Sequence, residues 1–393
     1  GVDFIHVSGG NTIKRGSSMP APGTSAAPHA HSSEEIKKHV NIPVATVARI
    51  NEPWMAEELI ANGKCDMCMI GRPNLCDSEF ANKAFEGNVD DIRPCIGCGR
   101  CLTGIMMGKR IGCTVNPSVE DDTIEEATDK KKVLVIGGGP AGMEAAYVAK
   151  KRGHEVVLCE KSNELGGQLR LAAVPIAKQE LCKVIKFMIR RLDHEGIDVR
   201  LNTEVTKEMF ENEFKDYEIV CSSGATPKEI PPFKVFKNWM TADDVLSGKK
   251  YPGRNIVVLG GGSVGCETAD YLAPLINDLF PMNRKITLLE MTNNLMPGEG
   301  GAAKSRLTQR LMQKGVRIEL NAQVTSVDED SITYVKEGVE HKITEADTLI
   351  FAVGYAPKKV EVEGENVHYI GDCEKVGTLK DAITNAHEIA KNI

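Results

Sequence analysis

The segment RPCIGCGRCLTGIMMGKRIGCTVNP, residues 93–117, carries four cysteines in an uneven pattern. Cys95, Cys98 and Cys101 form a C-x2-C-x2-C run, and Cys113 follows after eleven further residues. The chain has 12 cysteines and no sign of secretion, so a tight cluster of thiols indicates metal or redox chemistry rather than a disulfide framework. We therefore predict a metal centre at these four side chains.

Three interpretations compete for this pattern. Structural zinc sites usually take two ligands from each of two separate turns, whereas here three thiols come from one tight loop and one from further along. A [4Fe–4S] cluster fits a three-plus-one division, because one loop can bind three iron corners and a second segment the fourth. Gly97 and Gly99 leave room for backbone amides near the sulfurs. The spacing favours the iron–sulfur cluster, with zinc and inert thiols as the alternatives.

An internal repeat is the strongest sign of domain organisation. KKVLVIGGGPAGMEAA (residues 131–146) and RNIVVLGGGSVGCETA (residues 254–269) are near copies. Each copy joins a short apolar strand to a triple glycine and the start of a helix, as nucleotide-binding βαβ units do. The sequence therefore predicts two dinucleotide-binding units in tandem.

The first unit has a complete dinucleotide signature. Gly137, Gly139 and Gly142 form G-x-G-x-x-G, and Glu160 ends the next apolar run, EVVLCE. The glycines let the backbone approach a pyrophosphate at a helix N-terminus, and the carboxylate can bind ribose hydroxyls. The alternative, a plain tight turn, does not require the strand, the helix and the acidic residue together.

The second unit repeats the signature at Gly260, Gly262 and Gly265, with Glu290 ending the strand KITLLE. The acidic residue comes late because an insertion, residues 272–284, lengthens the crossover. A carboxylate here favours NADH, since it would repel the 2′-phosphate of NADPH, and no arginine follows in MTNNLMP to accept that phosphate. A solvated strand end is the alternative for Glu290.

Two further motifs resemble FAD-binding parts of enzymes with two dinucleotide domains. ELGGQL (residues 164–169) resembles the loop beside the FAD pyrophosphate, with Gly167 and Gln168 as its candidate contacts. YIGDC (residues 369–373) resembles the late Gly-Asp motif, in which Asp372 would hold a ribityl hydroxyl. CSSGATP and FAVGYAP resemble the strands that cross between the two domains. Together these motifs assign FAD to the first unit and NADH to the second.

The first 92 residues alternate apolar strands with helices. Strands are expected at residues 2–7, 42–50 and 65–72, and helices at about 33–40 and 52–62. Unbroken apolar strands alternating with helices favour a parallel sheet or barrel. After the cysteines, the acidic stretch VEDDTIEEATDKKK is typical of a domain boundary.

In their joint order these features resemble the iron–sulfur flavoproteins related to old yellow enzyme, a group that includes 2-enoate reductase, 2,4-dienoyl-CoA reductase, trimethylamine dehydrogenase and the bile-acid-inducible NADH:flavin oxidoreductases. The resemblance rests on HVSGG, IPVATVARI, MIGRP, DIRPCIGCGRC, the two GGG turns, ELGGQL and YIGDC, and covers nearly the whole chain. It implies electron transfer from NADH to FAD, then to a [4Fe–4S] cluster and to FMN. The FMN would reduce an activated C=C bond of an unsaturated acid, a CoA ester or an enone.

The resemblance also implies an α/β chain in four parts. Residues 1–92 would be the last strands of an FMN-binding (β/α)8 barrel, and residues 93–120 the iron–sulfur segment. Two Rossmann-like domains would follow: an FAD domain at residues 131–245 and 350–393, and an NAD(H) domain at residues 250–349.

In such barrels the FMN phosphate is held by the last two strand–helix loops. By resemblance these are Ala48-Arg49 and Gly71-Arg72, with Arg72 as the direct phosphate ligand. Ala48 stands where the family commonly has glycine, and a solvated charge is the alternative for Arg49. A barrel has eight strands and only three precede the cysteines. We therefore expect Gly1 to be a truncation, with the catalytic residues upstream of it.

Composition argues against several other classes. The 393 residues are 41% hydrophobic and 26% charged, with a net charge of −7 and no Lys/Arg block, which disfavours nucleic-acid binding. No apolar run is long enough to cross a membrane, and the N-terminus lacks a signal-peptide pattern. We expect a cytoplasmic protein with a small-molecule substrate, and a homo-oligomer is compatible with the sequence.

Two other functions are alternatives to the reductase that the resemblance implies. One is an electron-transfer module that serves a partner protein and has no organic substrate of its own. The other, a thiol–disulfide reductase, needs a redox-active C-x-x-C near the flavin. Cys65 and Cys68 lie before the FAD domain, and as positions i and i+3 of a strand they should face opposite sides of the sheet. Cys182 is expected as a small buried hydrophobe, and His29 and His31 as surface loop residues.

Overall fold

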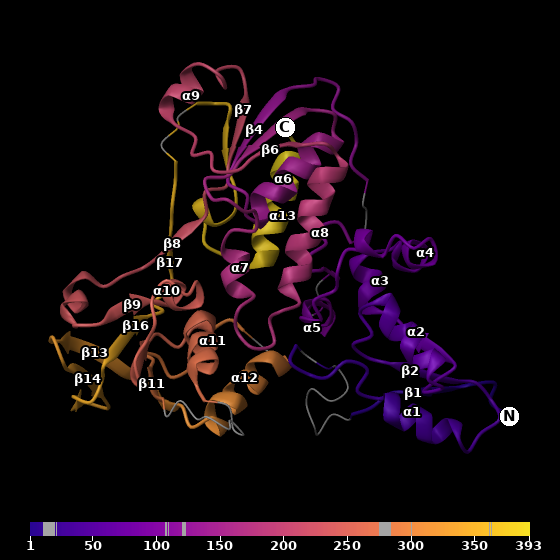
Figure 1. Cartoon of the computed structure of the whole chain (residues 1–393), viewed down its shortest axis with the longest axis horizontal. Coiled ribbons are helices and arrows are strands. Elements are labelled where there is room, and N and C mark those ends of the chain that lie inside the picture. Colours follow the sequence, from indigo (N-terminus) through magenta and orange to yellow (C-terminus); the bar gives the residue numbers. More distant parts are fainter. Residues whose placement is uncertain are drawn as a thin grey trace. The chain divides into compact units, whose positions relative to one another are not determined.

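The computed structural model divides the chain into two compact units (Figure 1). The first unit contains residues 1–170, 180–224 and 358–393, and the second contains residues 171–179 and 225–357. The structure describes residues 1–10, 20, 22–106, 108, 110–119, 123–274, 284–299, 301–360, 362 and 364–393.

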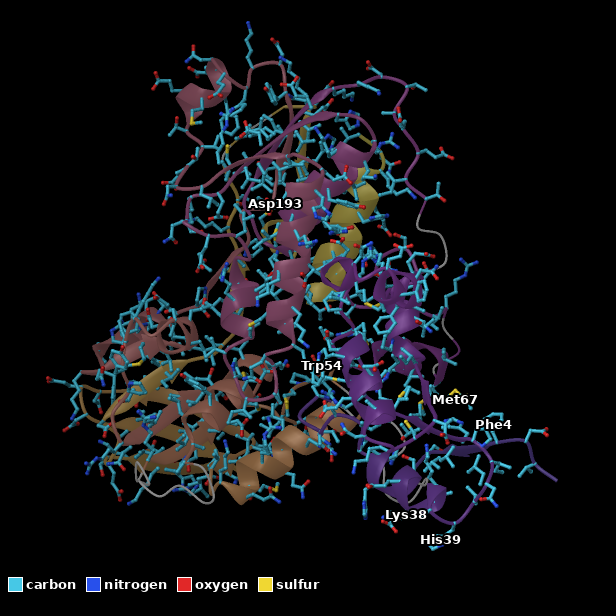
Figure 2. All side chains as sticks on the ribbon, turned by 45° about the vertical axis from the view of Figure 1, so that its right-hand side comes forward. Phe4, Lys38, His39, Trp54, Met67 and Asp193 are labelled. Atoms are coloured by element: carbon cyan, nitrogen blue, oxygen red, sulfur yellow. The ribbon has the colours of Figure 1, made fainter. Side chains whose placement is uncertain are left out.

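A three-stranded parallel sheet opens the first unit. Its order is β1 (Ile5–Val7), β2 (Val44–Val47) and β3 (Met67–Met69), with α1 (Ala30–Lys37) and α2 (Pro53–Ala61) as the connecting helices. The alternation of strands and helices is as expected, but each strand is shorter than its apolar run. Figure 2 shows three exposed apolar side chains of this segment, Phe4, Trp54 and Met67.

The start of α1 corrects two expectations. The helix begins at Ala30 instead of near residue 33, directly after its N-cap residue His29. His31 is exposed as expected, but it lies in α1 and not in a loop. His29 is half-buried, since its ring lies against Gly9, where a Cβ would come within 2.2 Å of the imidazole.

The expectations for three cysteines were wrong. The sulfurs of Cys65 and Cys68 lie 3.7 Å apart, because β3 begins only at Met67 and the alternation of a strand does not extend back to Cys65. Cys182 is exposed, since it lies on the outer side of the first turn of α8 (Leu181–His194).

The larger sheet of the first unit has five parallel strands in the order β18-β7-β4-β5-β6. These are β18 (Val367–Tyr369), β7 (Glu218–Cys221), β4 (Lys132–Ile136), β5 (Glu155–Cys159) and β6 (Asp198–Arg200). All but the first residue of β4 is buried, as a central parallel strand requires.

Three helices lie side by side against this sheet: α6 (Pro140–Lys151), α8 and α13 (Leu379–Ala390) (Figure 1). The α13 helix begins with a capping box, in which Thr378 and Asp381 satisfy each other's backbone N–H groups. The shorter helices of this unit are α3 (Arg72–Cys76), α4 (Phe80–Phe85), α5 (Arg100–Met106) and α9 (Lys207–Glu211). The α7 helix (Gln168–Ala172) begins in the first unit, and its last two residues belong to the second.

The second unit contains its own five-stranded parallel sheet, in the order β12-β11-β10-β16-β9. The strands are β12 (Arg317–Glu319), β11 (Lys285–Leu289), β10 (Asn255–Leu259), β16 (Thr348–Phe351) and β9 (Trp239–Thr241). The crossover insertion at residues 272–284 falls mainly on residues 275–283, which lie outside the described residues.

The second unit also contains helices and antiparallel strands. The helices are α10 (Ala242–Leu246), α11 (Ser263–Leu272) and α12 (Gly301–Gln313). An antiparallel sheet contains β13 (Ala322–Val327), β14 (Ile332–Lys336) and β15 (Val339–Ile343), and an antiparallel pair joins β8 (Ala225–Pro227) to β17 (Tyr355–Pro357). Both units therefore place a central strand directly before a Gly-rich turn and a helix.

Candidate cofactor sites

The turn between β4 and α6 is built for close approach by a ligand. Gly137 has φ of 103°, and Gly139 caps α6 without a side-chain hydrogen bond. A Cβ at Gly142 would lie 1.9 Å from the carbonyl oxygen of Gly137, so only glycine lets the helix pack against the turn. A Cβ at Gly139 would meet open space. The free N–H groups of this helix end suit a pyrophosphate.

Glu160 is oriented toward the same turn. Its Oε2 accepts a hydrogen bond of 2.6 Å from the backbone N–H of Gly138, and its Oε1 accepts bonds of 2.8 and 2.7 Å from the N–H and Oγ of Ser162. The residue is 8% exposed. Two carboxylate oxygens offer about four lone-pair sites, so acceptor capacity is left for ribose hydroxyls.

The second unit reproduces this geometry. Gly260 has φ of 109°, Gly262 caps α11, and a Cβ at Gly265 would lie 1.9 Å from the carbonyl oxygen of Gly260. Oε2 of Glu290 accepts a bond of 2.6 Å from the N–H of Gly261, and the residue is 8% exposed. Glu290 is therefore a buried partner of the glycine turn and not a solvated strand end.

The ELGGQL loop lies against the first turn. The N–H of Gly166 donates a bond of 2.8 Å to the carbonyl of Gly138, and a Cβ at Gly167 would lie 3.1 Å from Cα of Gly139. Gln168 then begins α7. The loop thus contributes a second wall beside the end of α6.

The YIGDC motif reaches the same helix end from the other end of the chain. A Cβ at Gly371 would lie 2.9 Å from Cβ of Ala141 in the first turn of α6. Asp372 follows, and its Oδ1 accepts a bond of 3.0 Å from the N–H of Gly377. Burial raises the pKa of Asp372. The first unit therefore brings its Gly-rich turn, Glu160, Gly167 and the segment carrying Asp372 to one end of α6.

All four clustered cysteines line one cavity in the first unit. Its other lining residues include Arg72 and a set of apolar side chains, namely Leu75, Ile96, Ile111 and Val115. Burial raises the pKa of Cys95 to about 12. Thr114 Oγ1 lies 3.2 Å from Sγ of Cys98. Four thiols facing one largely apolar space are a donor set for a soft metal centre.

A fifth thiol, Cys76, contacts this cluster. It is fully buried and hydrogen-bonded to Cys113. This bond, together with the backbone N–H groups of Val115 and Asn116, lowers the pKa of Cys113 to about 6. No spacing rule identifies Cys76, because it lies outside the C-x2-C-x2-C run.

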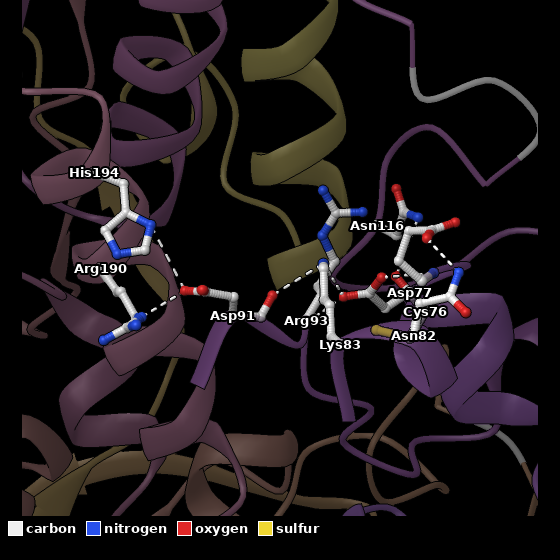
Figure 3. Close-up of polar contacts among 10 residues, drawn as sticks. Cys76, Asp77, Asn82, Lys83, Asp91, Arg93, Asn116, Arg190 and His194 are labelled. Atoms are coloured by element: carbon white, nitrogen blue, oxygen red, sulfur yellow. Dashed lines mark hydrogen bonds and ion pairs between the residues drawn. The ribbon is translucent and has the colours of Figure 1, made fainter. Parts of the chain in front are cut away.

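The cysteine segment is held at its two ends by polar contacts (Figure 3). Asp77 Oδ2 accepts bonds of 2.7 Å from the N–H of Arg93 and from Nζ of Lys83, and Asn116 Nδ2 donates a bond of 3.2 Å to the carbonyl of Cys76. In the same view Arg190 and His194 of α8 lie against Asp91. The segment before Cys95 is thereby attached to both α4 and α8.

A buried polar chain attaches the residues after Cys113 to the helices of the larger sheet. Ser118 Oγ lies 3.3 Å from Nε2 of His387, whose Nδ1 lies 3.1 Å from Glu144. Glu144 also accepts a bond of 2.5 Å from Arg191. Burial alone would raise the pKa of Glu144, but the Arg191 charge and the His387 bond lower it to about 2.

The two predicted FMN loops lie next to the cysteines. Ala48 and Arg49 have φ of 86° and 48°, the left-handed region that favours glycine. Arg49 forms an ion pair of 2.5 Å with Glu180. Nη1 of Arg72 donates bonds of 3.3 Å to the carbonyls of Gly97 and Pro20. Sequence reasoning missed Glu180, since nothing local links it to a residue 131 positions earlier.

Known proteins resemble this chain along its whole length. The family model for pyridine nucleotide-disulphide oxidoreductases matches residues 131–373. An NADH oxidase of Thermoanaerobacter brockii is 34% identical, over 100% of this chain and 62% of that protein. A cinnamate reductase of Clostridium sporogenes is 33% identical, over 92% of this chain and 55% of that protein. The structure of a 2-naphthoyl-CoA reductase in complex with 2-naphthoyl-CoA has a TM-score of 0.91 at 26% identity and covers 100% of this chain and 60% of that one.

One Gly-rich turn of the dinucleotide-binding type stands on each of two separate parallel sheets. The chain belongs to the pyridine nucleotide-disulphide oxidoreductase family, whose domain binds FAD and NAD(H), and to the group of flavoproteins related to 2-enoate reductase, as expected from its motifs. It spans about three fifths of the length of the relatives it matches. Within the described ranges, no helix has the length and apolar character needed to cross a membrane.

The left-handed backbone at Ala48 gives a stability prediction. Ala48→Gly should raise the free energy of unfolding by about 1 kcal/mol, because a Cβ at positive φ is strained. Ala45→Gly, in β2 just before Ala48 and in ordinary strand conformation, is the control and should lower the free energy of unfolding. Urea unfolding measures both, and a destabilising Ala48→Gly would show that this backbone carries no strain.

The paired glycines give a binding prediction. Gly142→Ala should abolish FAD retention while NADH binding persists, and Gly265→Ala should weaken NADH binding more than tenfold while FAD is retained, because each Cβ would clash with a carbonyl oxygen at 1.9 Å. Flavin absorbance after gel filtration and NADH titration by fluorescence provide the two readouts. Loss of both cofactors in both variants would contradict the separate assignment of the turns.

Proposed function

We propose that the chain is the NADH-accepting, electron-transferring part of an iron–sulfur flavoenzyme that reduces an activated C=C bond. Electrons would pass from NADH to FAD, then to a [4Fe–4S] cluster and to FMN. The observation that carries this proposal is the convergence of four cysteines on one cavity within the unit that also contains the first Gly-rich turn. The cinnamate reductase and the 2-naphthoyl-CoA reductase among its relatives support an unsaturated acid, CoA ester or enone as the substrate class.

The proposal gives individual residues the following roles, which the geometry of the two Gly-rich turns and of the cysteine cavity supports. The FAD pyrophosphate, ribose and ribityl chain would be held by Gly137, Gly139, Gly142, Glu160, Gly167, Gln168 and Asp372. NADH would be held by Gly260, Gly262, Gly265 and Glu290. The cluster would be bound by Cys95, Cys98, Cys101 and Cys113, and the FMN phosphate by Ala48, Arg49, Gly71 and Arg72.

The domain assignment is part of the same proposal. Residues 1–92 would contribute the last strands of the FMN barrel, and residues 93–120 the iron–sulfur segment. Residues 131–245 with 350–393 would bind FAD, and residues 250–349 would bind NAD(H).

The ligand pattern favours an iron–sulfur cluster over zinc. Three of the thiols come from one loop and the fourth follows at Cys113, whereas structural zinc sites usually take two ligands from each of two separate turns. A cubane binds its thiolates at four separate iron corners, which suits this three-plus-one division. In the structure all four thiols line one cavity.

A second function, an electron-transfer module for a partner protein, has one observation in its favour. Phe4, Trp54 and Met67 of the N-terminal segment are 46%, 58% and 38% exposed, and exposed apolar side chains suit docking. A thiol–disulfide reductase has less support, because residues 131–373 contain no C-x-x-C pair and Cys65 with Cys68 lies before them.

An anaerobic titration with NADH tests the proposed function. The protein is purified under argon, and its iron, acid-labile sulfide and flavin are quantified. NADH should then bleach the flavin absorbance and produce the low-temperature EPR signal of a reduced [4Fe–4S] cluster. In a preparation of the protein that also contains bound FMN, adding cinnamate or an enone should reoxidise the cluster. Bleaching of the flavin without any cluster signal would contradict the electron path.

The buried carboxylate of the second unit gives a selectivity prediction. Glu290→Gln keeps an acceptor for the N–H of Gly261 but removes the charge that would repel a 2′-phosphate. The ratio of kcat/KM for NADH over NADPH, measured with an artificial electron acceptor, should fall at least tenfold. Glu160→Gln is the control in the first unit and should leave this ratio unchanged. An unaltered ratio in Glu290→Gln would contradict the assignment of NADH selectivity to this carboxylate.

A further inference from the structure

Arg49 occupies an unusual position at the end of β2. It has a left-handed backbone, and its side chain is 8% exposed. One of its nitrogens, Nη2, forms the 2.5 Å ion pair with Glu180, the residue directly before α8. Among the described residues, its Nε and Nη1 are buried and have no hydrogen-bond partner. Two donor nitrogens of a buried cation are therefore available to a group next to them.

The group next to them is the loop of the clustered cysteines. A Cβ at Gly97 would lie 2.8 Å from Nη1 of Arg49, and Gly97 stands between Cys95 and Cys98. The carbonyl of Gly97 accepts its bond from Arg72. The guanidinium of Arg49 thus contacts the loop that supplies three of the four thiols.

We propose that Arg49 is a positioning residue of the iron–sulfur centre, whose buried charge, balanced by Glu180, sets the reduction potential of the [4Fe–4S] cluster. The inference rests on the proposed function, because it requires that the four cysteines bind the cluster. This role is additional to the place of Arg49 in the proposed FMN phosphate loop.

The sign of the effect follows from electrostatics. Reduction adds one negative charge to a cluster that its thiolates already make anionic. A buried cation beside the loop favours the reduced form and raises the potential, while a carboxylate beside that cation lowers it. Arg49 and Glu180 are 8% and 26% exposed, so water screens them less than it screens surface charges.

The test uses substitutions with opposite expected signs. Arg49→Gln should shift the midpoint potential of the cluster to more negative values, and Glu180→Gln should shift it to more positive values. Each shift should correspond to at least a tenfold change in the reduced-to-oxidised ratio at a fixed potential, which is 59 mV for one electron. Arg49→Lys, which keeps the charge, should stay near the wild-type value. Potentials are read by EPR during an anaerobic redox titration, without reference to turnover.

Lys183→Gln is the matched control. Lys183 lies one turn further along α8 and pairs with Glu52 at 2.5 Å, so it joins the same two segments. It is 46% exposed, and solvent screens its charge. Removing the charge of Lys183 should change the reduced-to-oxidised ratio of the cluster at a fixed potential less than twofold.

The outcomes separate the inference from the function on which it rests. Shifts of the same sign in Arg49→Gln and Glu180→Gln, or none, would overturn the role of Arg49 while leaving the cluster in place. If Arg49→Gln fails to incorporate iron, Glu180→Gln still decides the sign, because removing the carboxylate should make the potential more positive. A wild-type protein without iron and sulfide would overturn the cluster itself, and the role of Arg49 with it.

Discussion

Both candidate nucleotide sites depend on one repeated contact, a strand-end carboxylate that accepts a hydrogen bond from the N–H of the middle glycine in the preceding turn. The hydrogen bond from the N–H of Gly138 to Glu160 and the one from the N–H of Gly261 to Glu290 are both 2.6 Å long. The bond fixes the turn to the neighbouring strand, so the helix that follows begins at a set height above the sheet. The third glycine of each motif then lets that helix approach a carbonyl oxygen. Because the contact recurs on two separate sheets, it is a property of the motif and not of one domain.

The cysteine segment, residues 93–117, follows a different physical rule, since little of it is regular secondary structure. Its shape depends on charged and polar groups that come from elements far apart in the sequence. Asp77 fixes the chain before Cys95, and the buried chain of Ser118, His387 and Glu144 fixes the chain after Cys113. Buried charges of this kind are costly unless they are paired, and most of those around the segment are paired. Arg49 is paired with Glu180, yet its Nε and Nη1 are buried and, like those of Arg191, find no hydrogen-bond partner among the described residues.

The sequence predicted those features that short stretches of the chain determine by themselves. The two turns, their carboxylates and the parallel strands next to them follow from short stretches whose glycines and apolar runs allow few other conformations. Contacts between distant residues were not predictable, such as Arg49 with Glu180 or Cys76 with Cys113. Two errors share one cause, because Cys65 and His29 were judged by the pattern of their own segments. In the folded chain Cys65 lies before its strand, and His29 packs on Gly9. The barrel strands stay a prediction from the family resemblance, and the cluster stays a prediction from the cysteine spacing.

The central claim is that Cys95, Cys98, Cys101 and Cys113 hold a [4Fe–4S] cluster in the unit that also contains the FAD-type turn. Mössbauer spectroscopy of anaerobically purified, ⁵⁷Fe-labelled protein tests it most directly. The account predicts four irons and four sulfides per chain, with the single mixed-valence doublet of a cubane, and loss of that signal in Cys113→Ala. One tightly bound zinc per chain without sulfide, or a full iron signal in Cys113→Ala, would contradict it.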